Sequence, residues 1–353
     1  MLNKIFKKKI HVYKAKDLMT KHVITLQPKE NLLKAQRMMS RYRIKKIVVV
    51  DVDYSHKNKK HPVGILTIKD ILKFLISDKT DRDVHEISIS EAMSKNLITI
   101  NKDNNIIDCS KALYNNNKIS SLIVVEDDDE YEDTKGHEQQ KSRSVSKKML
   151  LSGIITSTDF TAFFSEYCTG LVSVKDYMSH PVFTISINEK LLRAAELMIE
   201  KNVSQLVVTT ITVANGDQGS SLLGVLSESD ISRVTPALKS KTLRSVYENI
   251  QVIFASSKRN NIDDSIEPSL IRIQDIFTPN PTTIEQDSDL AEAAKIMIKQ
   301  GINGIPVTET SSSTTTEGQE EEEEGKKMMI IKNQQPLGII SKTDIVKALT
   351  KLE

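Results

Sequence analysis

Tryptophan is absent from this 353-residue chain, and all aromatic residues together make up only 5% of it. Proteins that bind single-stranded nucleic acid stack bases on aromatic side chains, so few such platforms are available here. Charge of one sign is not in excess either, because 49 Lys and Arg stand against 47 Asp and Glu. A nucleic-acid-binding protein, which needs a positive field along its surface, is therefore a remote alternative.

Cysteine is almost lacking too, since only Cys109 and Cys168 are present. This number excludes a disulfide scaffold, and no Cys/His cluster has the spacing of a zinc site. No apolar run approaches the roughly 20 residues that cross a bilayer, and the start of the chain lacks the apolar stretch of a signal peptide. We therefore expect a reduced, cytoplasmic chain without a metal site and without a membrane partner.

What the chain does contain is one pattern repeated four times. Each copy has a lead segment that ends in a hydroxyl residue, then a short strand, a helix and a long apolar strand. The lead segments are residues 16–20, 91–94, 175–179 and 274–278. The predicted helices cover residues 30–42, 105–116, 189–201 and 288–300, and their apolar residues recur at helical spacing. The apolar strands begin at Ile44, Ile119, Val203 and Ile302, and their unbroken runs predict burial on both faces. The second copy is the least regular, with Ser110, Lys111 and Tyr114 on the helix stripe.

These copies predict four structural units, at residues 15–77, 87–166, 172–236 and 270–351, and we number them units 1 to 4. A linker at 237–269 separates the last two units and has helical apolar spacing within 242–255. Two insertions, at about 127–146 and 309–327, are rich in charge, Ser, Thr or Glu and cannot form a core. We expect both insertions to be disordered.

A motif closes each unit: Gly, two apolar residues, Ser or Thr, two variable residues, and Asp. The hydroxyl residues are Thr67, Thr156, Ser227 and Ser341, and the acids are Asp70, Asp159, Asp230 and Asp344. Ser/Thr-x-x-Asp before an apolar run indicates a capped helix N-terminus. The same arrangement suits a ligand, because glycine permits close approach, the helix start favours phosphate, and Asp can accept ribose hydroxyls. Both interpretations can hold together.

This order and spacing resembles the CBS domain over about residues 16–349, and each tandem pair resembles a Bateman module. We call units 1 and 2 module 1, and units 3 and 4 module 2. The resemblance implies an α/β fold of the α+β type, with βαββα units that pair through their sheets. It also implies that clefts between paired units bind AMP, ADP, ATP or S-adenosylmethionine as a regulatory ligand.

The resemblance further implies site residues. The four motif aspartates would hold ribose, and the four motif hydroxyl residues would lie near ribose or phosphate. A further ligand-lining position falls on the strand threonines Thr25, Thr99, Thr184 and Thr283. Basic residues at the start of the second strand would reach phosphates, and only unit 1 has them, as Lys45 and Lys46. These two lysines could equally be a solvated strand start.

The variable motif positions differ in charge between units, with Lys69 in unit 1, Glu228 in unit 3 and Lys342 in unit 4. We therefore expect the clefts to differ in their preference for phosphate.

No nucleophile with a base, no metal cluster and no poised pair of carboxylates stands outside the repeats. We therefore expect no enzyme and no catalytic cofactor. The leading hypothesis is a stand-alone nucleotide sensor that signals to an effector protein, as a homodimer or as an intrachain disc of four units. The alternative is a ligand-free interaction scaffold.

Overall fold

The computed structural model describes residues 10, 12–78, 80, 82–116, 119–128, 149–214, 217–231, 271–309, 319–323, 326–330 and 336–352. The predicted linker helix and most of both insertions lie outside these residues.

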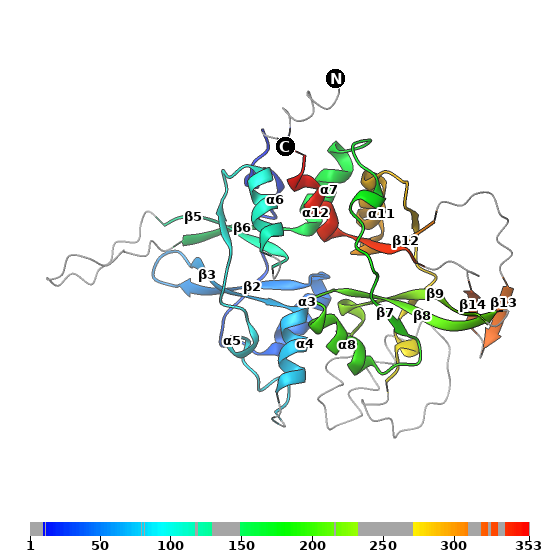
Figure 1. Cartoon of the computed structure of the whole chain (residues 1–353). Coiled ribbons are helices and arrows are strands. Elements are labelled where there is room, and N and C mark those ends of the chain that lie inside the picture. The colour runs from blue at the N-terminus through cyan, green and yellow to red at the C-terminus, as the bar shows by residue number, and fades with distance from the viewer. Residues whose placement is uncertain are drawn as a thin grey trace.

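All four units share one order of elements (Figure 1). Unit 1 contains α2 (Ala15–Leu18), β1 (Thr25–Leu26), α3 (Leu32–Tyr42), β2 (Lys46–Asp53), β3 (Lys59–Thr67) and α4 (Ile68–Ser77). Unit 2 contains α5 (Ile89–Ala92), β4 (Thr99–Asn101), α6 (Ile106–Asn115), β5 (Ser121–Asp127), β6 (Met149–Thr156) and α7 (Ser157–Tyr167). The predicted βαββα unit is therefore confirmed, preceded in each case by a short helical turn.

Module 2 repeats this order. Unit 3 contains the 3₁₀ helix η1 (Val174–Asp176), β7 (Thr184–Ser186), α8 (Leu191–Glu200), β8 (Gln205–Ala214), β9 (Asp217–Ser227) and a helical turn at 228–231. Unit 4 contains η3 (Ile273–Asp275), β10 (Thr278–Pro279), β11 (Ile284–Glu285), α11 (Leu290–Gln300), β12 (Gly304–Thr308), β15 (Gly338–Ser341) and α12 (Lys342–Thr350).

Each unit has one small sheet in which the second strand is central. In unit 1, Thr25 of β1 pairs with Val48 of β2 in parallel, and Lys46 of β2 pairs with Thr67 of β3 in antiparallel fashion. The other three units follow the same scheme. The central strands are buried on both faces as predicted, since Ile47 and Val49 face helices while Val48 and Val50 face the sheet of unit 2.

Part of the insertion at about 309–327, for which the sequence predicts disorder, lies among the described residues. Strands β13 (Gln319–Glu323) and β14 (Lys326–Ile330) form an antiparallel hairpin inside and beyond that insertion. Its register sets Glu323 opposite Lys326 and Glu322 opposite Lys327. Composition alone does not reveal such a register.

The lead segments cross between the two units of a module. Isolated backbone pairs join Thr20 to Ile154, Ser94 to Ile65 and Ser179 to Ile339, while Thr278 pairs with Val225 between β10 and β9. Each lead segment therefore lies on the last strand of the paired unit, beside that unit's motif. The exchange interlocks units 1 and 2, and likewise units 3 and 4.

The motif glycines make room for these crossing lead segments. A Cβ atom at Gly224 would lie 2.3 Å from the backbone oxygen of Thr278 and 2.5 Å from the Phe277 ring. One at Gly64 would lie 2.6 Å from the Met93 sulfur. The expectation that these glycines admit a ligand is therefore corrected, because the close approach observed is that of the paired unit.

This packing predicts a difference between two similar substitutions. Gly224→Ala should lower the free energy of unfolding by about 1–3 kcal/mol or more, because the obstacle is backbone and a ring. Gly64→Ala should cost less than Gly224→Ala, because the closest atom is the Met93 sulfur, which can move aside, and the nearest backbone atom, the Ser94 oxygen, lies farther away at 3.1 Å. Urea denaturation of both variants measures the difference, and equal losses would contradict this account of the glycines.

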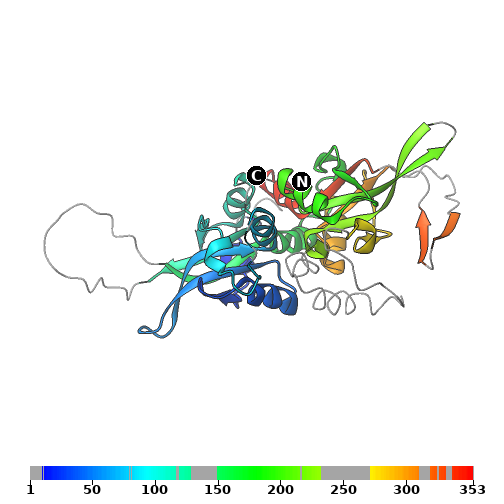
Figure 2. The same ribbon diagram turned by 90° about the horizontal axis from the view of Figure 1, so that it is seen from below.

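The helices form two layers with the sheets between them (Figure 1). One layer joins α6 and α7 of unit 2 to α11 and α12 of unit 4 around a common core that includes Phe160 and Phe164. The other joins α3 and α4 of unit 1 to α8 of unit 3. Figure 2 shows the two modules side by side, with module 1 mainly in blue and cyan and module 2 in green to red. Both helical cores therefore contain residues from both modules, and the four units pack within one chain.

Candidate functional site

The motif caps the following helix in every unit. In unit 1, the backbone N–H and the hydroxyl of Thr67 donate to Asp70 Oδ2 over 2.9 and 2.6 Å. In unit 2, Thr156 donates to Asp159 Oδ2 over 2.7 and 2.8 Å. The pairs Ser227 with Asp230 and Ser341 with Asp344 repeat this geometry at 2.8 and 2.6 Å. The capping interpretation is confirmed, and these bonds use one carboxylate oxygen of each aspartate.

The second carboxylate oxygen, Oδ1, has a protein donor at Asp344 of module 2 but none at the two motif aspartates of module 1 among the described residues. Asp344 Oδ1 accepts a hydrogen bond from Ser179 of the unit 3 lead segment at 3.0 Å. Asp344 and Asp230 are only 6% and 7% exposed, whereas Asp70 and Asp159 are partly exposed. Within the part of the chain that the structure describes, Oδ1 of Asp70 and Asp159 accepts no hydrogen bond. A ligand could therefore reach an unused oxygen in module 1.

Burial also acts on these carboxyl groups. It raises the pKa of Asp70, Asp159 and Asp344 above the ordinary value, even though the hydrogen bonds from the cap residues act in the opposite direction. The charged form of each is thus incompletely compensated. Additional donors at Oδ1, such as ribose hydroxyls, would stabilise that charged form.

Lysine ammonium groups lie near the motifs and contact other units. Lys46 Nζ donates to the backbone and side-chain oxygens of Ser120 in unit 2, at 2.5 and 2.7 Å. Lys342 Nζ of unit 4 donates to Thr158 Oγ1 of unit 2 at 3.1 Å. The contacts of Lys342 therefore bring module 2 to the helix start that carries Asp159.

The two lysines are unusual in their ionisation. Lys46 retains some accessible surface but lies deep among protein atoms, and this burial lowers its pKa to about 7. Burial and then the positive charge of Lys45 lower the pKa of Lys342 to about 8. Lys45 and Lys46 of unit 1 thus lie close to a lysine of unit 4, and this positive group would gain from a bound anion.

The lowered lysine pKa values predict how stability depends on pH. Above about pH 7 the folded chain loses the Lys46 proton that the unfolded chain keeps, so the free energy of unfolding rises with pH. Lys342 acts in the same direction from about pH 8. The buried thiols of Cys109 and Cys168, whose pKa burial raises to about 12, oppose this only above about pH 9.

Denaturation at about pH 6.5 and pH 8.5 measures the effect within this window. We expect the higher stability at pH 8.5, and a weaker dependence once both lysines are replaced by Met. A dependence that is the same in the double variant would contradict the assignment to Lys46 and Lys342.

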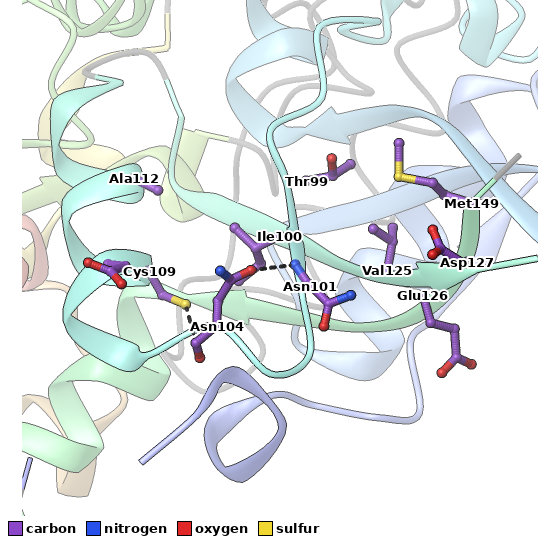
Figure 3. Close-up of a pocket in the computed structure, with 11 residues that line it drawn as sticks. Thr99, Ile100, Asn101, Asn104, Cys109, Ala112, Val125, Glu126, Asp127 and Met149 are labelled. Carbon is purple, nitrogen blue, oxygen red and sulfur yellow. Dashed lines mark hydrogen bonds between the residues drawn. The ribbon is translucent and has the colours of Figure 1, made fainter. Parts of the chain in front are cut away.

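Two of the four strand threonines line pockets. Thr99 lines a pocket of about 420 Å³ whose wall includes Asn101, Asn104 and Cys109 (Figure 3). Thr25 lines the matching pocket of unit 1, of about 240 Å³. Thr184 is exposed and Thr283 partly exposed. Neither of these two pockets includes a motif aspartate in its wall.

Several contact residues escaped the sequence analysis, namely Ser120, Thr158 and Asn202, which accept from Lys46, Lys342 and Lys69. Their role depends on the packing of units against one another, and no local pattern marks it. The hydroxyl that ends each lead segment was a weak signal for Ser179.

The residues that the structure describes contain no group of three or more His, Cys, Asp or Glu side chains placed to hold a metal ion. None of the helices seen there has the length and apolar character needed to cross a membrane.

Comparison with known proteins defines the family. A sequence model of the CBS domain matches residues 15–77, 88–132, 174–236 and 273–314, so the chain belongs to the CBS domain family. The chain is 22% identical over 340 residues to an uncharacterized protein of Methanocaldococcus jannaschii. That alignment covers 96% of this chain and 62% of the relative, so this chain spans less than two thirds of the relative's length.

Solved structures share the arrangement of all four units. Protein MJ1225 of Methanocaldococcus jannaschii, proposed to be an archaeal homolog of g-AMPK, is 19% identical with a TM-score of 0.64. The match covers 95% of this chain and 99% of that one. An uncharacterized conserved protein from Pyrococcus horikoshii is 14% identical with a TM-score of 0.51, over 96% and 100% of the two chains. The fold is therefore that of a protein with two CBS pairs.

Proposed function

We propose that this chain is a nucleotide-sensing protein that binds an adenosine-type ligand between the paired units of module 1 and signals its presence to a partner protein. Asp70 and Asp159 hold the ribose in this proposal, and Thr67 and Thr156 position these carboxylates. The ligand is AMP, ADP, ATP or S-adenosylmethionine, and no catalytic step is involved. The unused Oδ1 atoms of the two aspartates carry the proposal.

The surroundings of these oxygen atoms suit a nucleotide. A ribose presents two neighbouring hydroxyl donors, and a carboxylate oxygen beside a capped helix start can accept them. The N-termini of α4 and α7 add backbone N–H groups and a positive dipole end, which favour phosphate. Lys46 lies close enough to Asp159 to lower the pKa of that carboxyl. Lys45, Lys46 and Lys342 are therefore the proposed phosphate contacts at the Asp159 cleft.

Module 2 has a more structural role in this proposal. Asp230 and Asp344 are buried, and Ser179 already donates to Oδ1 of Asp344. A ligand at Asp344 Oδ1 would first have to displace this hydrogen bond. We therefore assign the stronger ligand binding to Asp70 and Asp159. Module 2 contributes Lys342 from across the boundary between modules.

The packing also offers a route for signalling. Lys342 connects units 4 and 2, and the helical cores contain residues of both modules. A ligand phosphate that draws Lys342 away from Thr158 would change a contact between modules. Such a change could alter the surface presented to an effector protein.

A ligand-free scaffold is the rival function, and thermal unfolding separates the two. We expect AMP, ADP, ATP or S-adenosylmethionine to raise the melting temperature, since a ligand at 100 times its dissociation constant adds about 2.7 kcal/mol of stability. Inosine and free phosphate serve as controls for ligand specificity. The absence of a shift with every adenosine ligand at millimolar concentration would favour the scaffold.

A further inference from the structure

Glu228 is acidic, whereas the residue at the same motif position is not acidic in the other three units. It directly follows the cap residue Ser227, and the matching residues are Ile68, Ser157 and Lys342. Its side chain does not extend into solvent, because Glu228 is only 9% exposed. It lies instead at the boundary between modules, where its Oε1 is 3.3 Å from Lys69 Nζ of unit 1.

The Glu228 carboxylate is incompletely satisfied by the protein. Among the residues described, its buried Oε1 has no partner with hydrogen-bond geometry, in spite of the short distance to Lys69. Lys69 Nζ donates instead to Asn202 Oδ1, at 3.2 Å. Lys69 therefore has a second partner in unit 3 and does not depend on Glu228 alone.

The influence of Glu228 reaches a second lysine. Its negative charge raises the pKa of Lys46, in opposition to the larger effect of burial. One carboxylate thus acts on two lysines of unit 1 that lie near the proposed phosphate positions. Because the Glu228 side chain is 11% exposed and that of Lys69 is 29% exposed, water screens their charges less than it screens those of fully exposed side chains.

We propose that Glu228 is a specificity-determining residue, an internal anion that competes with ligand phosphates for Lys69 and Lys46. The proposal rests on the function proposed above and adds a preference within it. Each additional phosphate brings negative charge toward a site that already holds one carboxylate. The chain therefore favours an adenosine ligand with one phosphate or none over a polyphosphate, and the carboxylate of module 2 sets this preference for module 1.

Glu228 also stands in the first turn of a helix, where any acid interacts favourably with the helix dipole. A purely structural role would change stability without changing ligand preference. Glu292 provides a matched control, because it lies in the first turn of α11 and is exposed. Glu292→Gln removes the same charge from the first turn of another helix, where the side chain is exposed.

The test compares the full chain with Glu228→Gln and Glu292→Gln. Titration calorimetry with ATP and AMP should show that Glu228→Gln improves the affinity for ATP relative to AMP by roughly 5- to 50-fold. Glu292→Gln should leave that ratio within about twofold of the parent chain. An unchanged ratio in Glu228→Gln, or an equal change in both variants, would overturn the proposal.

Inorganic tripolyphosphate gives a readout that does not need adenosine recognition. It should raise the melting temperature of Glu228→Gln more than that of the parent chain. With orthophosphate, the difference between the two melting-temperature shifts should be smaller. If the parent chain bound no adenine nucleotide, the proposed function would fail, and the tripolyphosphate comparison would still decide the role of Glu228. Equal shifts with tripolyphosphate would then overturn it.

Discussion

With Asp159 replaced by alanine, the affinity for AMP should fall by about 10- to 150-fold, which corresponds to about 1.5–3 kcal/mol for lost hydrogen bonds to a charged group. The reason is that Asp159 Oδ1 is the oxygen left for a ribose after Oδ2 has accepted from Thr156. The same variant should lose about 1 kcal/mol of stability through the weakened helix cap. Calorimetric titration and urea denaturation measure the two effects separately.

Asp230→Ala is the matched control for this prediction. Asp230 accepts the same cap bonds from Ser227 but is only 7% exposed. Its replacement should lower stability and leave AMP affinity nearly unchanged. If Asp159→Ala melted earlier but bound AMP as tightly as the parent chain, Asp159 would be a helix cap only.

The second large effect concerns the core between modules. Phe164 of α7 is fully buried, and α7 packs against α11 and α12 of unit 4. Phe164→Ala should therefore cost about 3–5 kcal/mol of stability. Because the core is common to both modules, α11 and α12 should lose hydrogen-exchange protection together with α7.

Phe183→Ala serves as the control, since Phe183 is 38% exposed and lies outside the helical cores. It should change stability by less than about 1 kcal/mol. Loss of protection confined to units 1 and 2 in Phe164→Ala would show that the modules fold independently, contrary to the packing observed.

The features that could be predicted from the sequence are those set by residues close together in the chain, namely helices and their caps. The helix expected at 189–201 occurs as Leu191–Glu200, because its apolar stripe is a local pattern that the core of units 1 and 3 buries. The four caps were likewise predictable, since Ser/Thr-x-x-Asp places donor and acceptor within one turn. The first strands are only two or three residues long, at Thr25–Leu26 for example, because the chain before them crosses to the paired unit.

What the sequence could not predict depends on how the units pack. The motif glycines were read as space for a ligand, and only the crossing of the lead segments shows that Phe277 and Met93 fill that space. The helices of unit 1 pack against those of unit 3, and the helices of unit 2 against those of unit 4. No pattern within a single repeat predicts this packing. For the same reason, Glu228 and Lys69 differ in charge in the sequence, but their contact across modules appears only in the structure.

Titration of AMP into the full chain and into an Asp70→Ala/Asp159→Ala double variant tests the central claim most directly. We expect saturable binding by the parent chain, and an affinity lower by at least about 100-fold in a folded double variant. Equal affinity in the double variant, or no binding of any adenosine ligand by the parent chain, would contradict it.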